Sequence, residues 1–267
     1  MAEDRDGAGG GAEGLATPGA TATPITLVES GRLEEALGAL TPAQAAWARS
    51  NGFSGRLGTW LALPDEAGGI ARVLVGWGDP EAHRRERFGL GGFAARAPAG
   101  NYRLESEPAP EAAETAALGW LLARYGFERY KQKGGQSEAL LASPPGVDAA
   151  RLAVIAEGVF IARDLINTPA NDMGPAALEG AARRLAERHG AEFAVTAGPD
   201  LIAENLPLIH AVGRAGTEPP RLIDIAWGPA DAPILALVGK GVCFDTGGLD
   251  IKPASGMRLM KKDMGGA

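Results

Sequence analysis

Hydrophobic and polar residues follow two different periods along this chain. Short apolar runs between residues 59 and 78, "TWLALP" and "ARVLVGWG", are typical of strands. In the longer segments "LEEALGALTPAQAAWARS" and "EAAETAALGWLLARYGFERY", apolar residues recur every three or four positions, which predicts helices. The mixture of strand-like and helix-like segments between residues 25 and 147 predicts a small α/β domain.

Polar segments lie on both sides of this domain. Residues 1–24 are mainly Gly, Ala, Thr and Pro with scattered acids, and they cannot bury enough apolar surface to offset the entropy of ordering. Residues 131–147, "KQKGGQSEALLASPPGV", are typical of a joint between domains. We therefore predict a disordered tail at 1–24, an N-terminal α/β domain at 25–147 and a second domain at 148–267.

The second domain begins with two predicted helices. Asp148 can cap the first helix, and Pro169 prevents its continuation. The second helix is expected to start near Pro175 and to stop before Gly190. Three candidate strands follow, with the sequences "EFAVTAG", "RLIDIAWG" and "ILALVG". Short apolar runs that alternate with helices predict an α/β fold with a largely parallel or mixed central sheet covered by helices.

Composition and charge narrow the class of protein. The formal net charge is -7, with 26 Lys and Arg against 33 Asp and Glu, so a general nucleic-acid binder is not predicted. Cys243 is the only cysteine, which excludes an intrachain disulfide and favours a cytoplasmic location. The most apolar long segment, "RLAVIAEGVFIA", is too short to span a bilayer, and the first residues lack the order of a signal peptide. No membrane association is predicted.

Charged residues gather in the Gly-rich segment after "ILALVG". Asp245, Lys252 and Asp263 follow Lys240 by 5, 12 and 23 residues, a spacing that only a folded loop could bring together. Ligands of parallel sheets collect at the carboxyl ends of strands, where Lys240 is expected to lie. Carboxylates suit Mn²⁺ or Mg²⁺ and tolerate Zn²⁺, whereas a lysine ligates only as the neutral amine. On composition alone, a solvated turn remains the alternative to a metal site.

The motifs "VGKGVCFDTGG", "IKPASGM" and "MKKDMGGA" resemble, in residue type, order and spacing, the signature of the leucyl aminopeptidase family of dinuclear metallo-exopeptidases. The segments "ARDLINTPANDMGP" and "HAVGRAGTEPPRLIDIAW" look like the same family's approach to its catalytic domain. Clear resemblance covers residues 151–267. The first 145 residues resemble the family's N-terminal, macro-like α/β domain only loosely.

The resemblance implies a role for each motif residue. Lys240 would be a ligand of one metal ion and Asp245 would bridge two ions, which in this family are Mn or Zn, with Mg also possible. Asp263 would complete part of one ion's shell and help to hold the free amino group of a peptide substrate. Lys252 matches the catalytic lysine that stabilises the oxyanion formed when water attacks the scissile carbonyl. Met260 matches a position that lines the pocket for the first side chain of the substrate.

The chain also departs from the family pattern. The second signature, "NTDAEGR", which supplies two further carboxylate ligands and an arginine, does not occur in these residues, and Thr246 stands where the family has Ser. We therefore expect a fragment with an incomplete catalytic domain that is inactive alone. A non-catalytic binding or scaffolding member of the family is the alternative. Family members commonly form hexamers, which we expect of the full-length protein, and some bind DNA, for which the acidic charge gives no support.

Overall fold

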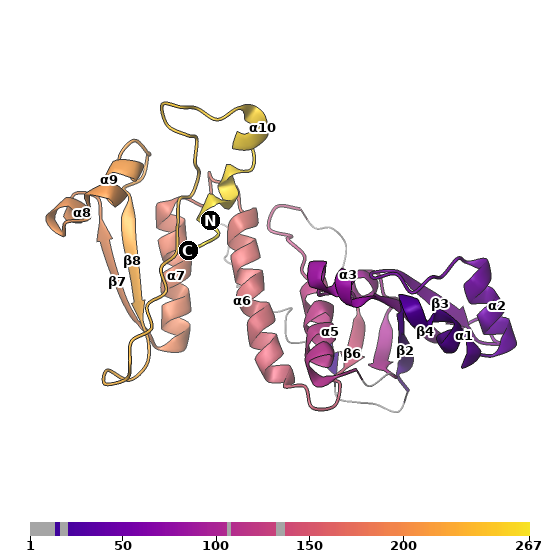
Figure 1. Ribbon diagram of the computed structural model, residues 1–267. Helices are drawn as coiled ribbons and strands as arrows, with labels where there is room; N and C mark the ends of the chain where they lie inside the picture. The colour runs from indigo at the N-terminus through magenta and orange to yellow at the C-terminus, as the bar shows by residue number, and fades with distance from the viewer. Residues whose placement is uncertain (1–13, 17–20, 106–107, 132–136) are drawn as a thin grey trace. The chain divides into compact units, whose positions relative to one another are not determined.

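The computed structural model describes residues 14–16, 21–105, 108–131 and 137–267 (Figure 1). The contacts within the chain divide it into two units, Met1–Ile161 and Ala162–Ala267. This division falls inside one long helix, whereas the boundary predicted at residue 147 lies just before that helix. The predicted boundary stays a prediction.

A six-stranded sheet organises the first unit. Neighbouring strands are parallel except for the antiparallel pair β3 and β4. Across the sheet the strands are β1 (Leu15–Ala16), β6 (Ala139–Ala142), β5 (Gly100–Leu104), β2 (Thr23–Glu29), β4 (Ile70–Gly78) and β3 (Trp60–Pro64). The predicted strands at 59–64 and 71–78 are confirmed by β3 and β4. The α/β fold class with a mostly parallel sheet is also confirmed.

The predicted tail at 1–24 is described only in part. Residues 1–13 and 17–20 lie outside the described residues. Within the tail, Leu15 and Ala16 form β1 and pair with Leu141 and Ala142 of β6, so these two residues belong to the sheet. Leu15 and Ala16 have apolar side chains, whereas the prediction of a disordered tail rested on the polar residues around them.

Both faces of the sheet in the first unit are covered. Successive side chains of a strand point to opposite faces, so Val73 and Val75 of β4 enter one buried cluster and Leu74 enters the other. The first cluster contains the fully buried Trp120 of the helix α5. Burial on both faces explains why β4 is an almost continuous apolar run.

The two segments predicted as helices in the first unit are helical with changed bounds. The second, residues 111–130, is helical only to Ala123, and further short helices lie outside both segments. The segment predicted as one helix at 33–50 forms two, because the Thr41 hydroxyl accepts the N–H of Gln44 and Pro42 supplies the first turn of a new helix. The helices are η2 (Ser30–Arg32), α1 (Leu33–Gly38), α2 (Pro42–Ser50), α3 (Pro80–Arg85), α4 (Gly91–Ala94) and α5 (Pro110–Ala123).

Two long helices dominate the sequence after residue 148, as predicted. The helix α6 (Ala149–Asn167) starts after Asp148 and ends before Pro169. The helix α7 (Pro175–His189) ends at Gly190, whose backbone is left-handed. Shorter helices follow: α8 (Asp200–Ala203), α9 (Pro207–Gly213), α10 (Ala254–Met257) and η3 (Met260–Met264). None of the described helices is long and apolar enough to cross a membrane.

In the second unit the structure describes two of the three predicted strands. The two strands that the structure describes there, β7 (Glu192–Ala197) and β8 (Arg221–Ala226), form an antiparallel pair. The prediction of a third strand at residues 234–239 is wrong, because none of the described strands pairs with these residues. Ile234 and Val238 are 95% and 98% exposed. A strand needs a neighbour for its backbone hydrogen bonds, and an apolar run alone does not supply one.

Candidate metal centre

The segment that carries the predicted site folds back on itself. The backbone at Gly239 lies so close to Gly266 that a Cβ atom at residue 239 would stand 2.1 Å from the Gly266 carbonyl oxygen. This close approach is available only to glycine. It brings Lys240 beside the residues that precede Gly266, and the Lys240 ammonium forms an ion pair with the carboxylate of Asp263.

A tight loop forms a second pair from the same segment. Gly247 has a φ of +90°, and a Cβ atom there would lie 2.2 Å from the Asp250 carbonyl oxygen, so this position requires glycine. The turn lets the Gly247 N–H donate to Asp245 Oδ1 at 2.8 Å. Lys252 Nζ donates to the other oxygen of Asp245 at 3.0 Å, and its backbone N–H bonds the Thr246 carbonyl at 2.9 Å.

Electrostatics connect the two pairs. The hydrogen bond from Lys252 lowers the pKa of Asp245 most, followed by the hydrogen bond from the Gly247 N–H, and the positive charges of Lys252 and Lys240 lower it further. Asp245 is therefore ionised at neutral pH, which is the form that binds a cation. The charge of Lys240 lowers the pKa of Asp245, and the Lys240 ammonium pairs with Asp263. The four predicted residues therefore form one charged cluster.

Met260 and Asp263 belong to the short helix η3, which the core of the second unit anchors. Met264 is 2% exposed and packs in a buried cluster with Met173 and Leu178. Met260, at the first position of η3, is half-buried. The sequence predictions assigned no role to Lys261, whose ammonium donates to the backbone at the end of α6. In the sequence, the two consecutive lysines directly before Asp263 could have indicated this contact.

The donor set fits a cation in part. Each of the two carboxylates has a lysine ammonium beside it that offsets its charge, so a bound cation would have to displace or share both contacts. Among the residues that the structure describes, no three His, Cys, Asp or Glu side chains group closely enough to hold a metal ion. Asp245, Asp263 and the amine of Lys240 are fewer donors than two ions require, so further ligands would have to come from other groups.

Cys243 lies in this segment without joining the cluster. Its side chain is partly buried against the same apolar group as Met173 and Met264. Burial raises the pKa of the Cys243 thiol, and the negative charge of Glu218 raises it further. A thiol with a raised pKa is a weak nucleophile, which supports a packing role.

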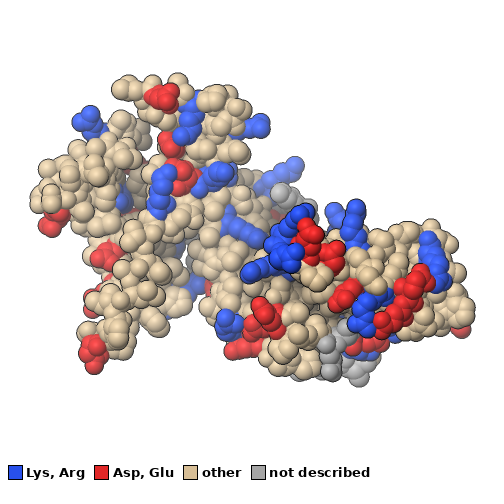
Figure 2. Space-filling view, in the orientation of Figure 1, with Lys and Arg blue, Asp and Glu red and all other residues tan. Residues whose placement is uncertain are grey.

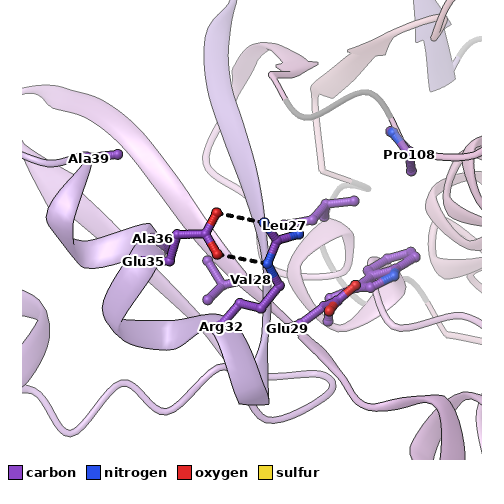
Figure 3. A pocket seen from close by; sticks show the side chains of 9 residues that line it. Leu27, Val28, Glu29, Arg32, Glu35, Ala36, Ala39 and Pro108 are labelled. Carbon is purple, nitrogen blue, oxygen red and sulfur yellow. Dashed lines mark hydrogen bonds and ion pairs between the residues drawn. The ribbon is translucent and has the colours of Figure 1, made fainter.

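A separate cavity of about 380 Å³ lies in the first unit at the end of β2 (Figure 3). The Arg32 guanidinium in its wall binds both oxygens of Glu35, at 2.9 and 2.6 Å. This contact lowers the pKa of Glu35 and raises that of Arg32. The charges of Arg32 and Glu35 therefore neutralise each other, and Glu29 adds a further negative charge to the lining of the cavity. None of the predicted site residues lines the cavity.

The surface charges show a similar balance. On the face shown in Figure 2, Lys and Arg side chains are interspersed with Asp and Glu side chains. Exposed ion pairs, such as Arg49 with Glu34 and Arg85 with Glu81, join charges of opposite sign.

Two models of one protein family match this chain. The model described as "Cytosol aminopeptidase family, catalytic domain" matches residues 160–267. The model described as "M17 aminopeptidase, N-terminal domain" matches residues 23–144. The second match covers the part of the chain whose sequence resemblance was loose.

Similar proteins and structures carry related names. A "Probable cytosol aminopeptidase" of Rhizobium meliloti is 40% identical over 172 residues, covering 59% of this chain and 34% of that protein. One from Brucella anthropi is 35% identical over 246 residues, covering 82% of this chain and 49% of that protein. The crystal structure of the cytosol aminopeptidase from Coxiella burnetii is similar with a TM-score of 0.84 and 38% identity, covering 94% of this chain and 54% of that one.

A maturation enzyme is also similar in structure. The bottromycin maturation enzyme BotP in complex with Mn has a TM-score of 0.69 and 30% identity, over 91% of this chain and 53% of that one. The chain thus spans about a third to a half of the length of the curated relatives it matches.

Proposed function

Because the chain belongs to the cytosol aminopeptidase family, we propose that the protein is a metal-dependent aminopeptidase that releases N-terminal amino acids from peptides. The observation that supports this most directly is the charged cluster of Lys240, Asp245, Lys252 and Asp263. These residues lie within a stretch of 24 positions, and they form two ion pairs. The charge of Lys240 in one pair lowers the pKa of Asp245 in the other.

Three residues would hold the metal ions. We assign Asp245 as the ligand shared by two ions, and Lys240 and Asp263 as ligands of one of them. Two divalent ions bound there would activate a water molecule and polarise the scissile carbonyl. Lys240 would bind as the neutral amine, so metal binding must displace both its proton and its contact with Asp263. Carboxylate donors suit Mn or Zn, and also Mg. The similar structure of BotP is a complex with Mn, which favours Mn among these ions.

Lys252 would supply positive charge to the reaction. Its ammonium is held 3.0 Å from Asp245, which keeps it beside the proposed metal ligand instead of free in solvent. An ammonium fixed in this way stabilises the oxyanion that develops on the scissile carbonyl. Asp263 would also accept the free α-amine of the substrate, and Met260 would line the pocket for its first side chain. Recognition of a free amine explains cleavage at the N-terminus.

The names of the relatives and the single cysteine support a cytoplasmic location. We also propose a homo-hexamer for the full-length protein, on the family resemblance. Residues 1–267 by themselves would not turn over aminoacyl amides, because three donors do not complete a two-metal site.

A metal and activity assay on the full-length protein tests the proposal. We expect hydrolysis of a leucyl amide that stops after chelation and returns with Mn²⁺. Asp245→Ala should abolish turnover that added Mn²⁺ cannot restore, since this carboxylate serves both ions. Asp250→Ala, a change at an exposed aspartate of the same loop, is the matched control and should keep activity. Two tightly bound ions in dialysed Asp245→Ala would refute the assignment. Peptide binding without turnover by the wild type would favour the non-catalytic alternative.

A further inference from the structure

Lys261 contacts the end of a helix far away in the sequence. Its Nζ donates to the carbonyl oxygen of Ile166 at 2.7 Å and to that of Asn167 at 3.0 Å. The helix α6 ends at Asn167, and the last carbonyl groups of a helix have no N–H partner within it. The helix dipole also places partial negative charge there, which favours an ammonium. Lys261 therefore donates to two backbone carbonyl groups at the end of α6.

The end of α6 is a well-fixed anchor for this contact. The N–H and the hydroxyl of Thr168 both donate to the Asp164 carbonyl, at 3.0 and 2.7 Å. Thr168 is buried. With Thr168 closing the last turn, the carbonyl groups of Ile166 and Asn167 are held in a defined direction.

Lys261 lies within η3, between two residues of the proposed site. Met260 precedes it, and Asp263 follows it by two positions. A five-residue 3-10 helix is not stable by its own hydrogen bonds, so its position depends on tertiary contacts. Lys261 and the buried Met264 supply such contacts on either side of Asp263. The neighbouring Lys262 is exposed.

We propose that Lys261 is a positioning residue, which holds η3 on the end of α6 so that Asp263 stays beside Lys240. The proposal rests on the proposed function for the role of Asp263 as a metal ligand. Lys261 itself touches neither the metal nor the substrate. Its loss would let η3 move and would weaken the site that Asp263 helps to form.

Mn²⁺ binding to the full-length protein gives the first test. Lys261→Met keeps the length of the side chain and removes its donors, and it should weaken Mn²⁺ binding by about 10-fold to 100-fold, the usual effect of losing a group that orients a ligand. Lys261→Arg keeps donors for both carbonyl groups and should recover most of the affinity. Lys262→Met is the matched control and should bind Mn²⁺ like the wild type.

Hydrogen exchange of the metal-free protein gives a second test that does not depend on activity. The amides of Lys262, Gly265 and Ala267 form the hydrogen bonds of η3 and the residues after it. They should exchange faster in Lys261→Met, while the amides of α7 keep wild-type rates. Wild-type exchange and wild-type Mn²⁺ affinity in Lys261→Met would overturn the proposal, and so would equally faster exchange in α7, which indicates general destabilisation.

The two tests also separate this proposal from the proposed function. A wild-type protein that neither binds Mn²⁺ nor hydrolyses leucyl amide, with faster exchange confined to η3 in Lys261→Met, would refute the metal site and keep Lys261 as the anchor of η3. A wild type that binds Mn²⁺ and hydrolyses the amide, with Lys261→Met unchanged in both tests, would keep the function and refute the anchor.

Discussion

Lys252 Nζ lies 3.0 Å from Asp245 Oδ2, and the two residues are seven positions apart in one loop. The contact exists because Gly247 turns the chain and the Lys252 N–H bonds the Thr246 carbonyl. It holds an ammonium beside the carboxylate that we assign to both metal ions. The group that we assign to charge stabilisation and the group that we assign to metal binding thus share one loop.

Substitution of Lys252 should separate metal binding from chemistry. The ammonium meets charge that develops only in the transition state, so Lys252→Ala in the full-length enzyme should lower kcat by on the order of 10²–10³, with a smaller change in KM. Metal content should stay near that of the wild type. Steady-state kinetics on a leucyl amide and metal analysis check both parts. Undiminished turnover by Lys252→Ala would show that the assignment is wrong.

Substitution of Lys240 should affect one metal site more than the other. Lys240 is assigned to a single ion, whereas Asp245 is shared, so Lys240→Ala should lose one ion on dialysis and keep the second. Metal counting on the dialysed protein measures this, with Lys262→Ala as the control. Loss of both ions together would contradict the assignment, as would retention of both.

The close approach at Gly239 predicts a steric effect. A Cβ atom at Gly239 would overlap the Gly266 carbonyl oxygen, so Gly239→Ala should push apart the segments that carry Lys240 and Asp263. We expect weaker Mn²⁺ binding and lower kcat. Gly256→Ala is the matched control, because a Cβ atom at Gly256 meets nothing within 4 Å. Equal Mn²⁺ affinity in the two variants would argue against the proposed role of this backbone contact.

Glu179 should make the second unit sensitive to acid. Hydrogen bonds from Arg183 and then Arg221 lower the pKa of Glu179 below its ordinary value of 4.5. Because the folded-state pKa is lowered, the stabilisation is present above pH 4.5 and is lost as the pH falls through the lowered value. Hydrogen exchange of α7 and β8 should therefore show Glu179→Gln to be less stable than the wild type by about 1 kcal/mol at pH 7.

That difference in stability should shrink as the pH falls below 4.5, where the wild-type carboxyl becomes protonated. Glu187→Gln, at an exposed position of the same helix, is the control and should match the wild type at neutral pH. A difference between the wild type and Glu179→Gln that did not change with pH would exclude the ion pairs as its source.

Cys243 should react slowly with thiol reagents in the folded protein. Burial raises the pKa of its thiol, so the reactive thiolate is scarce at neutral pH. Carboxymethylation at pH 7 should be slow when the protein is folded and should become faster in denaturant. Cys243→Ala should keep turnover of leucyl amide, since the thiol takes no part in the proposed reaction. Loss of turnover together with unchanged metal content would give Cys243 a role that we have not assigned.

The sequence by itself determined the local elements and indicated the candidate site. Pro175 and Gly190 set the ends of α7, because proline suits the first turn of a helix and glycine suits its left-handed end. Apolar periodicity determined β3, β4 and α6. The motif residues Lys240, Asp245, Lys252 and Asp263 were chosen from residue type, spacing and the family resemblance, and the structure joins them in two ion pairs.

Only the tertiary structure decided how strands pair and which lysine anchors η3. The sequence predicted a largely parallel or mixed sheet without saying which strands pair. In the structure β7 and β8 form an antiparallel pair, and residues 234–239 pair with no described strand. Leu15 and Ala16 join the sheet across more than a hundred residues. Lys261 reaches carbonyl groups 94 and 95 positions earlier. Pairing and anchoring depend on contacts between distant segments, and the local pattern of apolar and polar residues does not encode which segments will meet.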